Sequence, residues 1–404
     1  MSSSVTLKDI VQAQELLKGV IHKTLLDKSH TFSEMTGAEG VYLKLENLQK
    51  TGSFKIRGAY HKIRSLTDKE RRCGVIAASA GNHAQGVAYG ARAAGIKATI
   101  VMPEQAPLAK VMATRSYGAE VVLAGSVYDE SFQKALELQK VSGQVFVHAF
   151  NDEAVIAGQG TIGLEIVDDL PDIGAIVVPV GGGGLIAGIA AAVKARAPHV
   201  KVIGVQAKGA SAMYLSKQAH ELKGTASAVT IADGIAVKTP GDLSFSIIDK
   251  YVDDIVVVDD ESIAAAILML LERSKLMVEG AGAVSLAALL QGLTPVKGKV
   301  AAVISGGNVD VNFISRIIER GLVKAGRRVK LSTYILDRPG ELQRLLAVVA
   351  ELQANVINIY HDRLEQNVPI GESVVELRLE TRDALHTDAI VGSLRKKGYS
   401  VYLV

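Results

Sequence analysis

The stretch VVPVGGGGLIAGIAAAV, residues 177–193, is the strongest indication of fold class in this 404-residue chain. A β-branched apolar run ends in four glycines, and Leu185 then begins a run of small and aliphatic helix formers. A strand, a glycine turn and a helix in direct succession are typical of the crossover unit of a parallel α/β sheet. Ligands of such sheets bind at the carboxyl ends of the strands. The stretch therefore predicts an α/β fold with a ligand site at the glycine turn.

The glycines also indicate which ligand to expect. Gly181, Gly182, Gly183 and Gly184 lack a Cβ, so the backbone can wrap around an anion while loop amides and the helix N-terminus donate to it. The spacing matches neither GxGxxG nor GxxxxGK[ST], which argues against a dinucleotide fingerprint and against a Walker loop. A flexible turn without a ligand is the alternative.

The same alternation of strands and helices extends from about Thr6 to Val323 and predicts a mostly parallel sheet. Several of the expected strands are apolar throughout, as strands covered on both faces should be. Strands are expected at 74–78, 98–102, 120–123, 175–179, 202–206, 255–258 and 300–305, and crossover helices at 82–94, 185–195, 260–276 and 282–291.

A differently patterned region begins after the polar, basic segment KAGRRVK at 324–330. Strands are expected at 329–336, 356–363, 372–380 and 400–403, with helices at 341–353 and 384–397. The order βαββαβ is the ferredoxin-like pattern. We therefore expect a first domain over residues 1–325, with a small lobe at about 53–150 inside it, and a second domain over residues 326–404.

Composition excludes several classes of protein. Hydrophobic residues make up 48% of the chain, and 39 glycines stand against 9 prolines, which argues against disorder, collagen and coiled coil. The net charge of +3 is spread along the chain, so no nucleic-acid partner is expected.

Location is inferred from cysteine content and from apolar segments. The single cysteine, Cys73, cannot form an internal disulfide, which favours a reducing cytoplasm. The N-terminal residues lack the pattern of a signal peptide. The uncharged stretch 173–193 is interrupted by Pro179 and the glycines, so we expect a strand, loop and helix there and no membrane partner.

Two further segments carry candidate site residues. Ser79, Ala80, Gly81, Asn82 and His83 follow the expected strand 74–78, where consecutive amides with Ser and Asn side chains can hold a carboxylate or a phenolic oxygen. An N-cap without a ligand and a structural histidine are an equally good interpretation of these residues alone.

The other segment is QKTGSFKIRGA at 49–59, paired with AAVISGGNVD at 301–310. Lys55 lies among Phe54, Ile56 and small residues, and burial there would lower the pKa of its amine and make it a nucleophile. A surface lysine is the alternative.

Metal and hydrolase chemistry are poorly supported by the motifs. The chain has no HExxH, CxxC pair or EF-hand loop, and no GxSxG elbow. We expect no metal site.

Taken together, these residues resemble the serine/threonine dehydratases, pyridoxal-phosphate enzymes of the tryptophan-synthase-β fold type. The resemblance spans essentially the whole chain and rests on the number and order of its motifs. The matching stretches are KLENLQKTGSFKIRGA (44–59), SAGNHAQG (79–86), PVGGGGL (179–185), TIADGIAVKTPG (230–241), VEGAGAV (278–284) and ISGGNVD (304–310).

The resemblance implies a role for each matched residue. Lys55 would be the Schiff-base lysine and the catalytic base, and Gly181–Leu185 the phosphate loop. Asn82 would hydrogen-bond the pyridine hydroxyl and Ser305 the pyridine nitrogen. Phe54 and Glu279 would line the cofactor pocket. The substrate carboxylate would be held by the loop residues Ser79, Ala80, Gly81, Asn82 and His83.

Departures within the resemblance favour one activity. Serine racemases carry a second serine where this chain has Ala80, so racemisation is expected to be minor. They also hold a divalent ion with acidic residues, where this chain has Gln206 and Ala212.

The last domain resembles an ACT domain, with DRPGEL at 337–342 matching the loop that receives small amino acids. The resemblance implies an effector site at Asp337, Pro339, Gly340 and Leu342, and a homodimer or homotetramer. A purely structural role in assembly is the alternative.

We therefore expect a regulated L-threonine ammonia-lyase that makes 2-oxobutanoate and ammonia, with L-serine as a slower substrate. An L-serine dehydratase, a serine racemase and a non-catalytic amino-acid sensor are the alternatives. The single ACT-like copy favours isoleucine as the effector.

Overall fold

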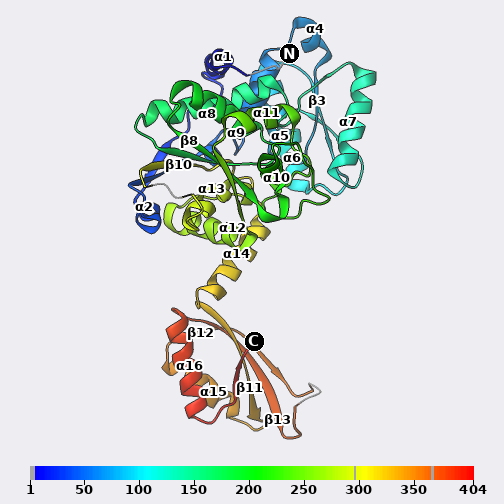
Figure 1. The fold of residues 1–404 in the computed structure, drawn as a ribbon. Coiled ribbons are helices and arrows are strands. Elements are labelled where there is room, and N and C mark those ends of the chain that lie inside the picture. The colour runs from blue at the N-terminus through cyan, green and yellow to red at the C-terminus, as the bar shows by residue number, and fades with distance from the viewer. Residues whose placement is uncertain (1–4, 295–296, 365–367) are drawn as a thin grey trace. The chain divides into compact units, whose positions relative to one another are not determined.

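The computed structural model describes residues 5–294, 297–364 and 368–404 and divides into two compact units, Met1–Val309 and Asp310–Val404 (Figure 1). The predicted boundary at 325/326 follows helix α14 (Val311–Lys324), whereas the compact units divide before it. The domain boundary between residues 325 and 326, which assigns α14 to the first domain, stays a prediction.

The larger sheet of the first unit has six strands in the order β1-β2-β10-β7-β8-β9. Its neighbours pair in parallel except β1 and β2, which are antiparallel. This confirms the expected α/β class with a mostly parallel sheet. The strands are β1 (Leu26–Ser29), β2 (Gly40–Lys44), β7 (Ala175–Pro179), β8 (Lys201–Ala207), β9 (Asp254–Val258) and β10 (Lys299–Val303).

The smaller sheet is entirely parallel and has the order β5-β4-β3-β6. It has a hydrophobic core of its own, built around residues such as Ile100 and Val87. The strands are β3 (Val75–Ala78), β4 (Ala98–Met102), β5 (Glu120–Leu123) and β6 (Val145–Phe146).

Helices surround both sheets of this unit. They are α1 (Leu7–Leu17), α2 (His30–Thr36), α3 (Lys55–Arg64), α4 (Asp68–Cys73), α5 (Asn82–Ala94), α6 (Leu108–Ser116), α7 (Tyr128–Ser142), α8 (Glu153–Asp169), α9 (Gly184–Arg196), α10 (Ala212–Ala219), α11 (Asp242–Tyr251), α12 (Asp260–Met269) and α13 (Gly280–Leu290). Short turns of other helix types lie at Glu46–Leu48, Lys208–Ala210, Asp233–Ile235 and Leu270–Ser274.

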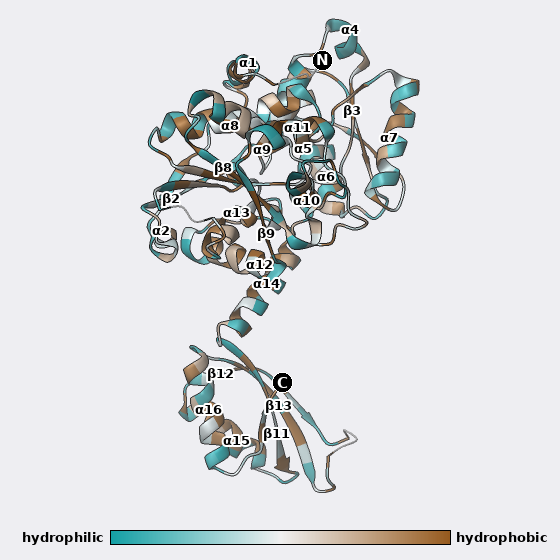
Figure 2. Ribbon diagram, in the orientation of Figure 1, coloured by the Kyte–Doolittle hydropathy of each residue, from teal (hydrophilic) through white to brown (hydrophobic). Residues whose placement is uncertain are grey.

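The main core lies where α8 and α9 pack against each other and against the larger sheet. A Cβ on Gly188 would lie 2.2 Å from the Ile156 carbonyl oxygen, so only glycine permits this close helix contact. Strand β7 is buried over its whole length, as its apolar sequence predicts. In Figure 2, β9 is brown within this unit, whereas the outer helix α7 alternates between teal and brown.

One expected helix is shorter than its sequence pattern suggests. Residues 260–276 were expected to form a single helix, but α12 ends at Met269 and a π-helical turn covers Leu270–Ser274. Lys275 then takes a left-handed conformation with φ of 60°, and the chain leaves the helix. The departure places Glu279 at the N-cap of α13.

The second unit has the element order β11 (Arg328–Leu336), α15 (Glu341–Glu351), β12 (Asn355–Asp362), β13 (Glu372–Glu380), α16 (Ala384–Lys396) and β14 (Val401–Leu403). Its sheet order is β12-β13-β11-β14, and all its pairs are antiparallel. The predicted βαββαβ element order is therefore present. Leu345, Leu377 and Ile390 belong to a separate core.

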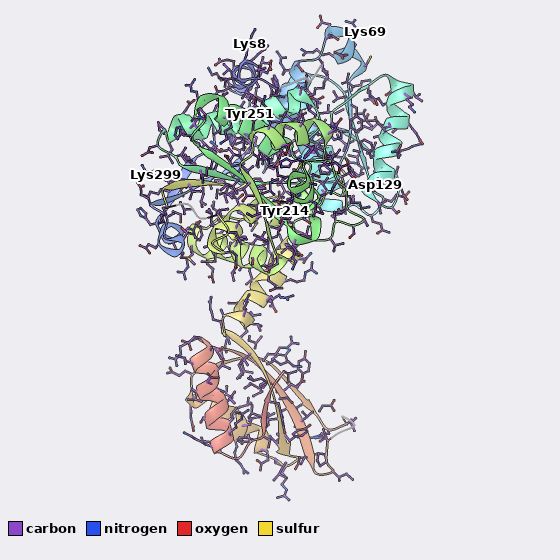
Figure 3. The ribbon with its side chains drawn as sticks, viewed as in Figure 1. Lys8, Lys69, Asp129, Tyr214, Tyr251 and Lys299 are labelled. Carbon is purple, nitrogen blue, oxygen red and sulfur yellow. The ribbon has the colours of Figure 1, made fainter. Side chains whose placement is uncertain are left out.

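Charged side chains such as Lys8, Lys69 and Asp129 lie at the periphery of the first unit (Figure 3). Among the described residues, no helix combines the length and apolar character needed to cross a membrane. The described part of the chain also holds no cluster of three or more His, Cys, Asp or Glu side chains suited to a metal ion.

Candidate active site

Backbone pairing places Lys55 beside Ser305. Strand β10 ends at Val303, and the chain beyond it runs past the start of α3. The Phe54 amide donates to the Ser305 carbonyl oxygen over 3.1 Å, and Ser53 forms an isolated antiparallel bridge with Gly306. The first residue of α3 is therefore held next to the carboxyl end of β10.

Lys55 is half-buried, and its amine lies in a weakly polar setting. Its Nζ donates to the Ala149 carbonyl oxygen over 2.9 Å and lies 5.1 Å from the centre of the Phe54 ring. Burial lowers the pKa of Lys55 to about 8, although the nearby Glu279 opposes the shift. A larger fraction of this amine is unprotonated near neutral pH than in an exposed lysine, which suits a nucleophile or base.

The glycine turn, Gly181–Gly184, packs against Phe150, which follows the Ala149 that accepts from Lys55. A Cβ on Gly182 would lie 2.4 Å from Phe150 ring atoms, and one on Gly184 would lie 2.7 Å from the Phe150 carbonyl oxygen. Because Phe150 directly follows Ala149, the turn and the Lys55 amine adjoin one stretch of backbone.

The turn has the shape of an anion cradle. Gly183 has φ of 100°, a left-handed conformation that favours glycine, and it caps the N-terminus of α9. The carbonyl group of its neighbour Gly182 is held in place by two hydrogen bonds from the start of α11. Its oxygen accepts from the Ser244 hydroxyl over 2.6 Å and from the Gly241 amide over 3.2 Å. The amides at the start of α9 can therefore face an anion.

Asn82 and Glu279 meet across the site. The Asn82 Nδ2 donates to Glu279 Oε1 over 2.7 Å. Burial raises the pKa of Glu279 to about 8, with repulsion from Asp233 adding to the shift and the Asn82 hydrogen bond opposing it. A Cβ on Gly306 would lie 2.4 Å from Glu279 Oε1, so the turn after β10 closes tightly on this carboxyl group.

Strand β10 ends two residues before Ser305, short of the expected strand 300–305, and Ser305 is almost fully buried, with 3% of its surface exposed. Its hydroxyl has one distant acceptor, the Ala281 carbonyl oxygen at 3.4 Å. That weak contact leaves the hydroxyl able to pair with a ligand.

The five residues from Ser79 to His83 do not all face one way. The Gly81 amide donates to the Ser79 hydroxyl over 3.2 Å, which forms a polar turn at the end of β3. The buried His83 ring instead donates from Nε2 to the Val147 carbonyl oxygen over 2.8 Å. Burial lowers the pKa of His83 to about 3, so the ring is neutral, and its buried Nδ1 has no hydrogen-bond partner among the described residues. Its sequence-predicted contact with a carboxylate stays a prediction.

The donor set fits the pyridoxal phosphate that the sequence resemblance implies. A cradle of glycines where a Cβ would collide suits a phosphate, and the half-buried amine of Lys55 suits an aldehyde. The amide of Asn82 and the hydroxyl of Ser305 can pair with the ring oxygen and ring nitrogen.

Sequence reasoning assigned no role to Asn308 or to Arg57, which also belong to this region. Asn308 donates to Asn82 Oδ1 over 2.9 Å. Its place in the glycine-rich ISGGNVD stretch was the available signal.

Arg57 lies one helical half-turn beyond Lys55 and is completely buried. It pairs with Glu46 at 2.7 Å and with Glu165 at 2.6 Å, and Lys44 pairs with Glu165 at 2.6 Å. Attraction to the two carboxylates more than offsets burial and raises the pKa of Arg57. The four charges join α3, β2 and α8 around the helix that carries Lys55.

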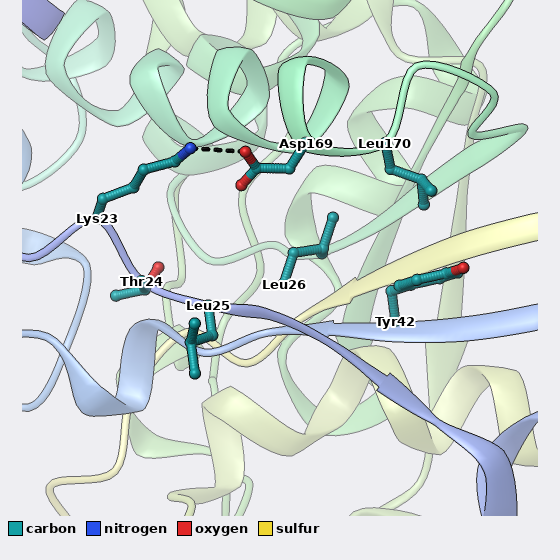
Figure 4. Close-up of a pocket in the computed structure, with 7 residues that line it drawn as sticks. All are labelled: Lys23, Thr24, Leu25, Leu26, Tyr42, Asp169 and Leu170. Atoms are coloured by element: carbon teal, nitrogen blue, oxygen red, sulfur yellow. Dashed lines mark hydrogen bonds and ion pairs between the residues drawn. The ribbon is translucent and has the colours of Figure 1, made fainter.

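The first unit has two cavities in this region, and one of them is lined by residues of the charge cluster. One of about 340 Å³ is lined by Arg57, Thr161 and Glu165, among others. The other, of about 290 Å³, lies beside the ion pair of Lys23 with Asp169 at 2.6 Å, and Figure 4 shows Tyr42 and Leu26 on its wall. Neither is lined by Lys55.

In the second unit, the sequence-predicted effector residues flank the loop before α15. Gly340 has φ of 91° and caps this helix, and Asp337 pairs with Arg363 at 2.9 Å. Pro339 and Leu342 lie on either side of the cap. A cavity of about 710 Å³ lies close by, and its lining includes Leu336, Glu341 and Arg344 but none of the four predicted residues.

The chain matches the family model of pyridoxal-phosphate dependent enzymes over residues 17–306. It is 56% identical to an L-threonine ammonia-lyase of Thermotoga maritima over 99% of this chain and all of that protein. It is 50% identical to an L-threonine ammonia-lyase of Geobacter sulfurreducens over 97% of this chain and 98% of that protein. The catabolic L-threonine dehydratase of Escherichia coli is 46% identical over 78% of this chain and 96% of its own length.

Solved structures share the fold at lower identity. Maize serine racemase superposes with a TM-score of 0.74 at 35% identity, over 80% of this chain and 99% of that chain. The processed form of tomato (Solanum lycopersicum) threonine deaminase isoform 2 superposes with a TM-score of 0.74 at 38% identity, over 78% of this chain and 86% of that chain.

Proposed function

The chain belongs to the family of pyridoxal-phosphate dependent enzymes, and from that premise we propose that it converts L-threonine to 2-oxobutanoate and ammonia. Its pyridoxal 5'-phosphate cofactor and its nature as a lyase follow from this membership and from near full-length relatives. The observation that best supports L-threonine as the substrate is the 56% identity to an L-threonine ammonia-lyase over 99% of the chain.

Each residue of the candidate site would have a separate role in an α,β-elimination. The amides of the glycine turn and of α9 would bind the cofactor phosphate, and Ser305 and Asn82 would orient the ring. The bound cofactor supplies an electron sink for charge that develops at the substrate Cα. The unprotonated Nζ of Lys55 would take the Cα proton, because burial keeps its pKa near 8.

The polar turn at the end of β3 would hold the substrate carboxylate. The backbone amides around Gly81 and the Ser79 hydroxyl are the donors available there. Holding the carboxylate fixes the direction of the Cα proton toward Lys55.

L-Serine is proposed as a slower substrate. It lacks one methyl group of threonine, and a methylene in an apolar pocket separates substrates by only about 1–3 kcal/mol. An L-serine dehydratase and a serine racemase are the competing activities, since a serine racemase shares the fold. Ala80 has no hydroxyl to return a proton on the second face of Cα, which favours elimination over racemisation.

We also propose that the second unit is an ACT domain that regulates the lyase. The βαββαβ order and the antiparallel sheet β12-β13-β11-β14 support this assignment. The Escherichia coli dehydratase is matched over 96% of its length by 78% of this chain, so the chemistry does not require the remaining residues. We further propose that the protein assembles into a homodimer or homotetramer and that it is cytoplasmic.

The deciding experiment is an assay of 2-oxobutanoate from L-threonine with the purified, cofactor-loaded protein, with and without isoleucine. Turnover that isoleucine suppresses supports both the lyase and the effector. Turnover that isoleucine leaves unchanged keeps the lyase and rejects this effector. A yellow protein without turnover rejects threonine, and comparison of kcat/KM for L-serine then separates the serine-directed alternatives. A protein that binds no cofactor favours the amino-acid sensor.

A further inference from the structure

The orientation of the Asn82 side chain is decided by a second asparagine. Asn308 Nδ2 lies 2.7 Å from the Thr51 carbonyl oxygen and 2.9 Å from Asn82 Oδ1. A main-chain carbonyl oxygen can only accept a hydrogen bond, so the group of Asn308 that faces Thr51 is its NH₂. The atom of Asn82 that faces the same NH₂ is then its oxygen.

This orientation directs the NH₂ of Asn82 toward the site. One of its N–H groups donates to Glu279 Oε1 over 2.7 Å, and the other is left for a ligand. If the amide of Asn82 were turned over, its oxygen would face the acceptors of the site and would repel a phenolic oxygen there.

The backbone at two glycines comes close to these side chains. A Cβ on Gly52 would lie 2.3 Å from Asn308 Oδ1, and Gly52 has φ of 71°. A Cβ on Gly306 would lie 3.1 Å from Asn82 Nδ2. Rotation of the Asn82 amide by a half-turn, which exchanges its oxygen and its NH₂, is the alternative state that Asn308 disfavours.

We propose that Asn308 is a positioning residue that holds the Asn82 amide with its NH₂ directed toward Glu279 and the cofactor, using the Thr51 carbonyl oxygen as its anchor. The inference rests on the cofactor contact proposed above for Asn82. It adds a residue that touches neither substrate nor cofactor and acts only through Asn82.

A double-mutant cycle on cofactor affinity tests the inference. The full-length protein is stripped of cofactor, and pyridoxal 5'-phosphate is titrated back while the visible absorbance is followed. Asn308→Ala is expected to weaken binding about tenfold, a loss typical of a hydrogen bond to a preorganised polar group. In an Asn82→Ala background the same change is expected to have no further effect.

Two further variants control the experiment. Asn308→Asp keeps the size of the side chain but places an acceptor opposite Asn82 Oδ1, so it should weaken binding as Asn308→Ala does. It also serves if Asn308→Ala does not fold. Asn312→Ala, at an exposed position four residues along the chain, should leave affinity unchanged.

The inference is overturned if the Asn308 variants bind the cofactor like the parent, or if they lose the same affinity with Asn82 present and absent. An Asn82→Ala variant with parental affinity would remove the proposed Asn82 contact and this inference with it. Failure of the threonine assignment is seen separately, because that assay measures product and not cofactor affinity.

Discussion

Lys55 is proposed both to bind the cofactor and to act as the catalytic base. Its amine is held by one hydrogen bond to Ala149 and has a pKa lowered to about 8. Lys55→Ala should abolish turnover of L-threonine while the far-ultraviolet circular dichroism and the unfolding temperature stay near those of the parent. Normal turnover by this variant would reject Lys55 as the catalytic base. Lys69→Ala, an exposed lysine, is the matched control.

Glu279 makes stability depend on pH. Its folded-state pKa of about 8 exceeds the ordinary 4.5, so its contribution to stability is present below pH 4.5 and is lost as pH rises through about 8. In the cofactor-stripped protein, Glu279→Gln should therefore gain in unfolding temperature relative to the parent as pH rises from about 5 to 8.5. Thermal unfolding at several pH values measures this, with Glu104→Gln at an exposed position as control. A difference that does not change with pH would contradict the assigned cause.

At the level of elements, the conformation of the turn between β7 and α9 requires glycines, because side chains there would collide with Phe150. Gly182→Ala would place a methyl group 2.4 Å from Phe150 ring atoms, and such overpacking costs about 1–3 kcal/mol. Because the turn must move, affinity for pyridoxal phosphate should fall by at least about tenfold. Gly298→Ala meets no atom within 4 Å and should bind normally. Equal affinities of the two variants would argue against the turn as the phosphate site.

The helix that carries Lys55 is joined to its neighbours by buried charge. Burial alone would raise the pKa of Glu46, but attraction and hydrogen bonds from Arg57 hold it below its ordinary value. Arg57→Met would leave the carboxylates of Glu46 and Glu165 without their shared partner, at a cost of about 3–5 kcal/mol.

Urea unfolding of Arg57→Met measures that cost directly. Arg64→Met, at the exposed end of the same helix, should change the free energy of unfolding by less than about 0.5 kcal/mol. Arg57→Met as stable as Arg64→Met would show that the charge cluster does not stabilise α3.

At the scale of the whole molecule, each compact unit has a hydrophobic core of its own. A chain that ends at residue 325 should therefore fold and turn over L-threonine, but it should lose any response to isoleucine. Residues 310–404 alone should unfold cooperatively, which calorimetry measures. Loss of turnover on truncation, with the fold retained, would show that the lyase needs its second unit.

Local pattern was sufficient to predict the order of the elements and the segments that meet at the candidate site. Apolar runs, glycine turns and helix formers act between residues close in the chain, so strands such as 175–179 and helices such as 82–94 follow from sequence. The π-helical turn after Met269 was missed, because the sequence continues to favour helix there while the chain bends to place Glu279.

The α/β class, the βαββαβ order of the second unit and the segments that form the candidate site all follow from local sequence patterns. Which atoms of those segments meet depends on the assembled fold. Asn308 lies 226 residues along the chain from Asn82 and still donates to it, and the Nε2 atom of His83 pairs with the Val147 carbonyl oxygen. The reason is physical: contacts between distant residues, and the burial that moves the pKa values of Lys55 and Glu279 toward 8, exist only when the sheets have assembled.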